Sequence, residues 1–182
     1  MSGWETEKRG VDMKRRWLMA VMALPVPVVV LIPAALLFAF RASRWPHSVP
    51  TPASPTFWLG AAVGIVGCIL ALWSVLAFVR HGRGTPAPWD PPTRFVAYGP
   101  YCFVRNPMIL GVFLLLLGEA VLLRSVPLFV WFAVFVVGNS LYIPRVEEKG
   151  LDRRFGTAYA QYRKSVPRWF PRWTAWHPDD VR

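Results

Sequence analysis

The sequence of 182 residues has few cysteines, few acidic residues and almost no charge inside its apolar runs. Its two cysteines exclude a disulfide-rich fold, and we expect both to be free thiols: Cys68 lies within an apolar run and Cys102 in a polar connection. No histidine or cysteine pair has metal-ligand spacing, so we predict no metal site. Apolar residues, by contrast, make up 54% of the chain and aromatic residues 15%, which indicates a membrane protein rather than a soluble domain.

Four apolar runs define the expected fold. Each is close to the roughly 20 residues that cross a bilayer as a helix, and Glu119 is the only residue with a formal charge in any of them. We therefore predict one all-α membrane domain, residues 1–182, with four transmembrane helices at residues 17–40, 57–79, 108–123 and 126–144. The first run is too long for the core of a secretory signal, so we expect it to remain as an anchor.

The positions of the basic residues indicate the membrane topology. Most of the 21 Lys and Arg residues precede the first run, lie between the second and third, or follow the fourth. By the positive-inside rule, this predicts a multi-pass protein with both termini and the 80–106 connection in the cytosol. The net charge of +11 is then explained by topology and by attraction to membrane lipids, and we expect no nucleic-acid partner.

The polar segments are expected to differ in role. Residues 1–16 form an N-terminal cytosolic arm, residues 17–79 hold the first two helices, and residues 172–182 form a tail. The connection 80–106 is rich in proline, glycine and aromatic residues, which predicts a structured loop packed on the membrane face. After the fourth run, apolar residues at spacings of three or four predict an amphipathic cytosolic helix, either an interface anchor or a lid: Leu151, Phe155, Tyr159, Tyr162 and Val166. Gly156 within it suggests a bend or a close contact.

A short turn places several polar residues together. The connection "RSVP" at residues 124–127 makes the third and fourth helices antiparallel neighbours, so Arg105 should lie beside Glu147 and Glu148. Arg105 could clamp a carboxylate, the helix beginning near Pro107 favours the same anion, and the glutamates favour an ammonium or ribose hydroxyls. In the simpler alternative, the arginines only set topology and the glutamates form surface salt bridges.

Several ordered motifs carry a family resemblance. "GPY" at residues 99–101 precedes "VRNP" at 104–107, a glycine follows four residues after that proline, and "EE" at 147–148 precedes "FGTAYAQY" and "VPRW". Over residues 80–171, the chain resembles the superfamily of isoprenylcysteine carboxyl methyltransferases and phospholipid N-methyltransferases. The resemblance implies an integral membrane methyltransferase that uses S-adenosylmethionine. It assigns cofactor binding to Tyr101, Arg105, Asn106, Pro107, Gly111, Glu147 and Glu148.

The resemblance implies methyl transfer to a lipophilic small molecule or lipid at the cytosolic membrane face, and we expect this transfer to be a direct in-line displacement. Arg105 and Glu148 are the expected catalytic residues, and Arg105 would hold either the cofactor carboxylate or an acidic substrate. Many relatives have histidine in place of Asn106, and an asparagine cannot act as a general base. This difference favours a carboxylate or another heteroatom that needs no deprotonation.

Two other functions compete with this one. A small four-span transporter could couple protons to a cationic substrate through Glu119, although the chain has no second intramembrane charge and no internal repeat. A membrane scaffold would leave the ordered motifs unexplained. We expect Glu119 to have a structural role, and the sequence leaves the oligomeric state open.

Overall fold

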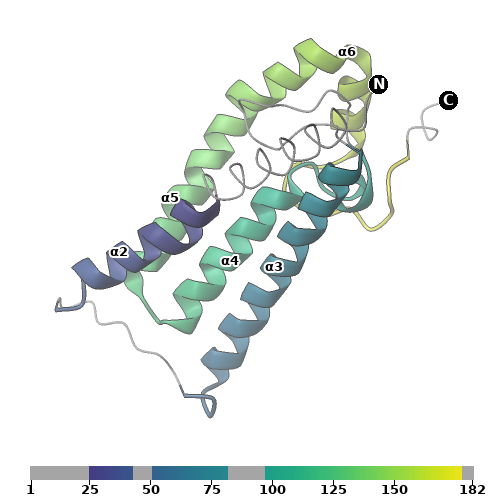
Figure 1. Cartoon of the computed structure of the whole chain (residues 1–182). Coiled ribbons are helices and arrows are strands. Elements are labelled where there is room, and N and C mark those ends of the chain that lie inside the picture. Colours follow the sequence, from purple (N-terminus) through teal and green to yellow (C-terminus); the bar gives the residue numbers. More distant parts are fainter. Residues whose placement is uncertain (1–24, 43–50, 82–96, 178–182) are drawn as a thin grey trace, which may run out of the picture.

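The computed structural model describes residues 25–42, 51–81 and 97–177, and these residues form helices, turns and extended connections without any strand (Figure 1). The all-helical prediction is therefore confirmed for the described chain. The expected N-terminal arm, the beginning of the first apolar run and residues 82–96 of the long connection lie outside the described residues.

The second and third predicted helices begin and end close to the predicted positions, and the fourth begins where predicted but continues into the next helix instead of ending near residue 144. The predicted start of the first helix lies outside the described residues. A π-helical turn, Pro27–Leu31, leads into α2 (Ile32–Ala39), and α3 covers Pro55–His81. A 3-10 turn, Gly99–Cys102, precedes α4 (Pro107–Leu122), and α5 covers Val126–Tyr142. A second π-helical turn, Ile143–Glu147, then joins α5 to α6 (Glu148–Ser165) without interruption. Each π turn has a proline in its first positions, where a missing N–H and a bulky ring disturb the α-helical ladder.

Two helical segments are long and apolar enough to cross a membrane, namely Pro55–His81 and Val126–Ser165. Within the second, the apolar part is α5, and α6 is polar on one side. Pro27–Ala39 and Pro107–Leu122 are also apolar but shorter. The structure thus supports two candidate spans directly, and the four-span arrangement and its orientation stay predictions.

Among the described helices, α3 and α4 form the most extensive contact, and glycines line it. A Cβ atom built on Gly67 would lie 2.7 Å from the Gly111 carbonyl oxygen, and one on Gly118 would lie 2.7 Å from the Gly64 nitrogen. Such distances leave room for hydrogen only, so the two backbones touch. Close approach through small residues is a common way for helices to associate in membranes, where lipid is as apolar as the side chains.

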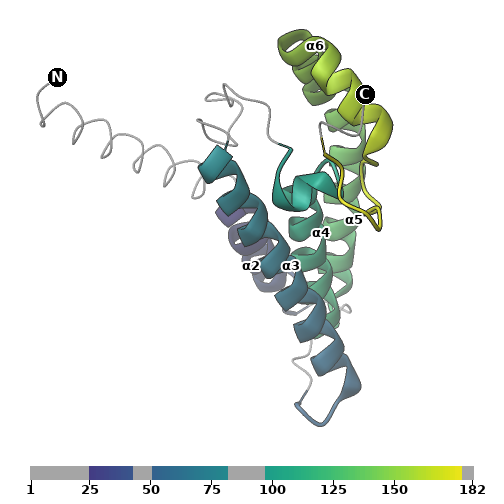
Figure 2. The ribbon, with the colours of Figure 1, turned by 90° about the vertical axis from the view of Figure 1, so that its right-hand side faces the viewer.

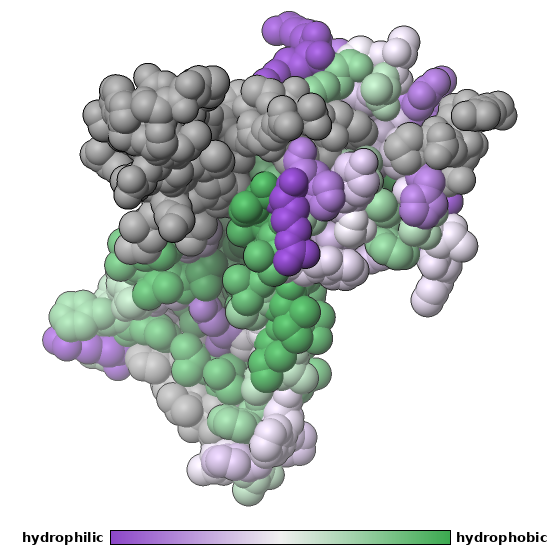
Figure 3. Space-filling view, turned by 45° about the vertical axis from the view of Figure 1, so that its right-hand side comes forward, coloured by the Kyte–Doolittle hydropathy of each residue, from purple (hydrophilic) through white to green (hydrophobic). Residues whose placement is uncertain are grey.

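The outer surface of the bundle is apolar. Only 17% of the most apolar window of each candidate span is buried, and Leu72, Val134 and Val137 are among the large side chains that face outward. Figure 3 shows hydrophobic residues covering the middle of this face of the molecule, with most of the strongly hydrophilic residues at the end where α6 lies. A soluble protein would bury these side chains, so this surface fits a lipid environment.

A small aromatic core forms beyond the end of the bundle. α6 buries Tyr159 and Tyr162 against Ala97, Val166 and Trp176, and the other two residues of the predicted apolar face, Leu151 and Phe155, pack partly buried beside them. The amphipathic helix is thus observed. Gly156 has φ of 53° and kinks α6, and no atom lies within 4 Å of its Cβ position, so of the two predicted alternatives the structure contains the bend. Figure 2 shows the chain after α6 turning back beside the 3-10 turn that precedes α4.

Candidate functional site

A buried carboxylate with two arginine partners lies where α4 begins and α6 starts. Arg105 Nη1 donates to Glu148 Oε1 at 2.8 Å, while Arg168 Nε and Nη2 donate to Oε1 and Oε2 at 2.7 and 2.9 Å. The side chains of Glu148 and Arg105 are only 6% and 10% exposed, and that of Arg168 is 29% exposed. We call these three residues the ion-pair cluster.

Three separate segments supply the cluster. Arg105 lies in the connection before α4, Glu148 is the first residue of α6, and Arg168 follows α6. Backbone hydrogen bonds join the first and third segments: Arg105 N donates to the Pro167 oxygen at 2.9 Å, and Arg172 N donates to the Phe103 oxygen at 3.0 Å. The chain after α6 is therefore fixed to the residues that lead into α4.

Hydrogen bonds in the aromatic core also hold α6 and the chain after it against the 3-10 turn that precedes α4. Tyr162 Oη donates to the Tyr101 carbonyl oxygen at 2.7 Å, and Trp176 N donates to the Cys102 oxygen at 3.0 Å. Burial, helped by the nearby Glu148 charge, raises the pKa of Tyr159 to about 12, although the charge and hydrogen bonding of Arg105 oppose the shift. Tyr159 is thus a neutral phenol next to the cluster at ordinary pH.

The cluster carries an excess of positive charge. Two guanidinium groups share one carboxylate, and the hydrogen bonds to Glu148 raise the pKa of Arg168, so that side chain stays charged. This net positive charge favours a further anion, because water screens it less at a mostly buried site than at the surface.

Two buried hydrogen-bond donors without an acceptor also favour an anion at this site. Arg105 Nε and Asn106 Nδ2 are buried and have no hydrogen-bond acceptor in the described part of the chain. Asn106 is the N-cap residue of α4, yet its side chain makes no capping bond, and Pro107 follows it in the first turn. Buried donors are nearly always satisfied in proteins, so these two, beside a helix N-terminus, suit an anionic ligand such as a carboxylate.

The predicted site residues do not all share one environment. Arg105, Asn106, Pro107 and Glu148 lie together, as the hairpin argument predicted, whereas Glu147 is exposed and belongs to no ion pair of the described residues. Tyr101 contributes its carbonyl oxygen to Tyr162. Gly111 lies against α3, where its Cβ position is 2.7 Å from the Ala71 nitrogen. Its observed contacts are therefore helix packing, and its part in cofactor binding stays a prediction.

Arg168 and Trp169 are functional candidates that sequence reasoning missed. Arg168 completes the cluster, and the ring of Trp169 packs on Phe113 of α4 with centroids 5.1 Å apart. The motif "VPRW" contains both residues, so a signal was present. It could not be interpreted because nothing in the sequence shows that the chain returns to the start of α4.

Glu119 lies in the last turn of α4, at the helix end opposite Asn106. Its Oε2 atom is buried without a partner in the described chain. Cys68 is exposed on the bundle and Cys102 is buried, and both are free thiols as predicted. The described residues contain no group of three or more His, Cys, Asp and Glu side chains that could hold a metal ion.

Comparison with known proteins identifies the family. The family model for phospholipid methyltransferases matches residues 55–158, which is more than half of the chain and includes α3, α4, α5 and the first part of α6. No curated protein and no solved structure gives a match. The matched region contains Arg105, Asn106 and Glu148, and ends before Arg168. The chain therefore belongs to the phospholipid methyltransferase family, part of the superfamily of membrane methyltransferases that its motifs indicated.

Proposed function

We propose that this protein is an S-adenosylmethionine-dependent methyltransferase that modifies a lipophilic acceptor at the membrane boundary near the ion-pair cluster. The observation that carries this proposal is the pair of buried donors without acceptors, Arg105 Nε and Asn106 Nδ2, next to the Arg105–Glu148 ion pair and inside the family match.

The donor set fits the amino-acid part of S-adenosylmethionine. Arg105 Nε, Asn106 Nδ2 and the first N–H groups of α4 suit its carboxylate, and the exposed carboxylate of Glu147 suits its ammonium group or ribose hydroxyls. When bound, the cofactor supplies an electrophilic methyl group on a sulfonium sulfur. The protein's own contribution is to bind, orient and exclude water.

Glu148 has a positioning role in this proposal. Both of its oxygens accept hydrogen bonds from arginines, which leaves it poorly suited to receive a proton from a substrate. Its charge instead holds the Arg105 guanidinium through Nη1, which leaves Nε available to a ligand. If the acceptor were an amine, Glu147 would be the carboxylate free to accept its proton.

The acceptor would arrive from the membrane. Exposed apolar side chains continue along α3 and α5 to the end of the bundle where the cluster lies, among them Leu76, Val79 and Leu141. A lipophilic molecule could therefore reach the cluster along the protein–lipid boundary. Asn106 supplies no base, which favours a carboxylate or another heteroatom that is already nucleophilic near neutral pH. Alignment alone can supply much of the rate in such a displacement, up to about 7–11 kcal/mol in intramolecular reactions.

Methyl transfer tests the proposal. Membranes containing the wild-type protein are incubated with S-adenosylmethionine labelled in its methyl group, and radioactivity is measured in the organic extract. We expect incorporation above that of membranes without the protein, and a loss of at least tenfold for Arg105→Ala.

Arg145→Ala is the matched control. Arg145 is exposed, lies on the adjacent π-helical turn and donates only to the Leu141 carbonyl oxygen among the described residues. It should retain most of the activity. Equal incorporation by the Arg105 and Arg145 variants, at equal amounts of folded protein, would contradict the proposed role of the cluster.

A further inference from the structure

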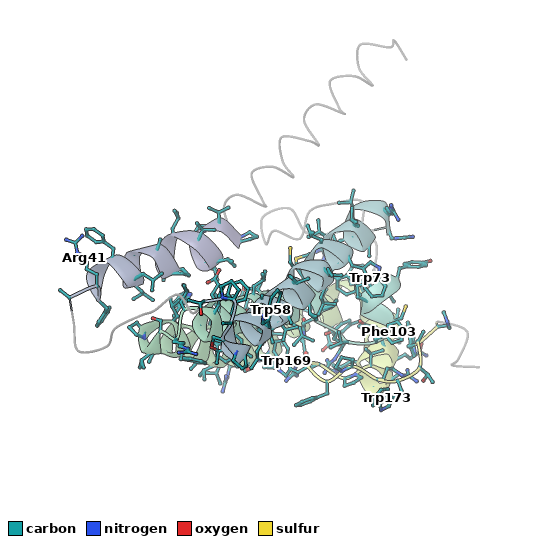
Figure 4. The ribbon with its side chains drawn as sticks, turned by 90° about the horizontal axis from the view of Figure 1, so that it is seen from below. Arg41, Trp58, Trp73, Phe103, Trp169 and Trp173 are labelled. Atoms are coloured by element: carbon teal, nitrogen blue, oxygen red, sulfur yellow. The ribbon has the colours of Figure 1, made fainter. Side chains whose placement is uncertain are left out.

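Two aromatic side chains after α6 have almost no contact with the rest of the protein. Trp173 is 101% exposed and Phe170 is 84% exposed, the highest values among the large hydrophobic residues of the described chain. Figure 4 places Trp173 at the outer margin of the molecule, away from the helix bundle. We call residues 169–173 the aromatic loop.

The aromatic loop is held in place although its aromatic tips are exposed. Trp169 at its beginning packs on Phe113, and Arg172 N donates to the Phe103 oxygen. The loop is therefore a fixed surface, and its exposed side chains do not result from a loose chain end.

Its contacts also give the depth of the loop relative to the bundle. Phe113 is six residues into α4, about 9 Å along the helix from its first residue. The Trp169 ring thus reaches below the first turn of an apolar helix, while Arg172 is level with residues just outside that helix. Phe170 and Trp173 consequently lie at the height where the apolar surface of the bundle ends.

The chemistry of the loop matches a lipid surface better than a protein partner. Tryptophan and phenylalanine next to arginine are typical of the boundary between acyl chains and head groups, and Arg172 lies between the two exposed rings in the sequence. Trp169 also joins the loop to the apolar helix α4 through its contact with Phe113, and the strong net positive charge of the chain complements anionic lipids.

We propose that the aromatic loop is a membrane-interface anchor, in which Phe170 and Trp173 insert among lipid head groups and acyl chains. Arg168 immediately precedes the loop, so insertion would also hold the third segment of the ion-pair cluster against the membrane boundary. This inference rests on exposure and position, and it holds whatever reaction the cluster supports.

Site-specific fluorescence tests the anchor. In a Cys68→Ala background, which leaves only the buried Cys102, Trp173→Cys is labelled with a polarity-sensitive dye and the protein is reconstituted in nanodiscs of phosphatidylcholine and phosphatidylglycerol. Leu72→Cys, on the exposed apolar surface of α3, is the lipid-facing control, and Gln161→Cys, exposed on α6, is the aqueous control. The unsubstituted background measures any labelling of Cys102.

The expected result is blue-shifted emission at position 173 and quenching by lipids that carry a spin label near the head group. Position 161 should show neither effect, and position 72 should be quenched most by a label deeper in the acyl chain. Emission at 173 that matches 161 would overturn the proposal. A blue shift at 173 without quenching by lipid-borne labels would also overturn it, because the loop would then be covered by protein.

Discussion

Arg168 gives the sharpest test of the ion-pair cluster, because the family match ends before it and its role follows from the structure alone. In Arg168→Ala, Glu148 loses a bidentate partner and keeps only the Arg105 bond. The segment that follows α6 also loses its side-chain connection to Glu148.

The expected loss of stability follows from burial. Breaking a fully buried ion pair costs about 3–5 kcal/mol. Arg168 is 29% exposed and Glu148 retains Arg105, so we expect a smaller loss, about 2 kcal/mol. For a chain of this size that corresponds to a thermal midpoint lower by about 4–8 °C. Arg168→Lys keeps the charge but cannot donate from two nitrogens of one fork, so its midpoint should fall in between.

The assay is thermal unfolding of the purified protein in one detergent, with Arg172→Ala as control. Arg172 lies four residues further on, and among the described residues its side chain makes only long hydrogen bonds, at 3.3 and 3.2 Å, to Ser165 and Thr174. We expect Arg172→Ala to unfold within about 2 °C of the wild type. Equal midpoints for the Arg168 and Arg172 alanine variants would refute the reasoning that Arg168 stabilises a buried carboxylate.

Three further predictions concern packing, pH and the distal carboxyl group. Gly67→Ala should destabilise the protein by about 1–3 kcal/mol, because the new Cβ would lie 2.7 Å from the α4 backbone, while Gly64→Ala, which meets no atom within 4 Å, should be nearly neutral in the same unfolding assay. Folding raises the pKa of Tyr159 from 10.0 to about 12, so the neutral phenol contributes stability that is fully present below pH 10 and is lost as the pH rises to 12. Tyr159→Phe removes this group, so its thermal midpoint should fall less than that of the wild type between pH 10 and pH 12. Glu119→Gln should leave methyl transfer unchanged, since Glu119 lies at the opposite end of α4 from the cluster, and a large loss of activity would show that this carboxyl group takes part.

The sequence predicted features that depend on neighbouring residues better than contacts between segments far apart in the chain. Helix positions were predictable because the length and apolar composition of each run indicate a helix without reference to the rest of the chain. The three-residue connection after α4 was enough to predict that Arg105 lies beside Glu148. The glycine contact of α3 with α4 was not foreseen, since spacing within one helix does not identify the partner helix. Arg168 was missed for a similar reason: its position depends on the chain returning after α6 to pair with residues before α4.

Among the paired glutamates, the sequence could not tell the two residues apart. The π-helical turn at Ile143–Glu147 ends just before Glu148, and adjacent residues on a helix point about 100° apart, so one carboxylate faces the arginines and the other faces outward. Two identical side chains thus have different environments in the structure. In our proposal, Glu148 orients Arg105 and Glu147 contacts the ligand.

Binding of S-adenosylmethionine to the purified protein in nanodiscs tests the central claim most directly. We predict saturable binding by the wild type and by Arg145→Ala, and at least a tenfold weaker affinity for Arg105→Ala and for Asn106→Leu, which removes the unpartnered amide donor. Folded content is matched beforehand by unfolding midpoint and size-exclusion profile. Absence of binding by the folded wild-type protein, or equal affinity in all four proteins, would contradict the assignment of the cofactor site to the start of α4.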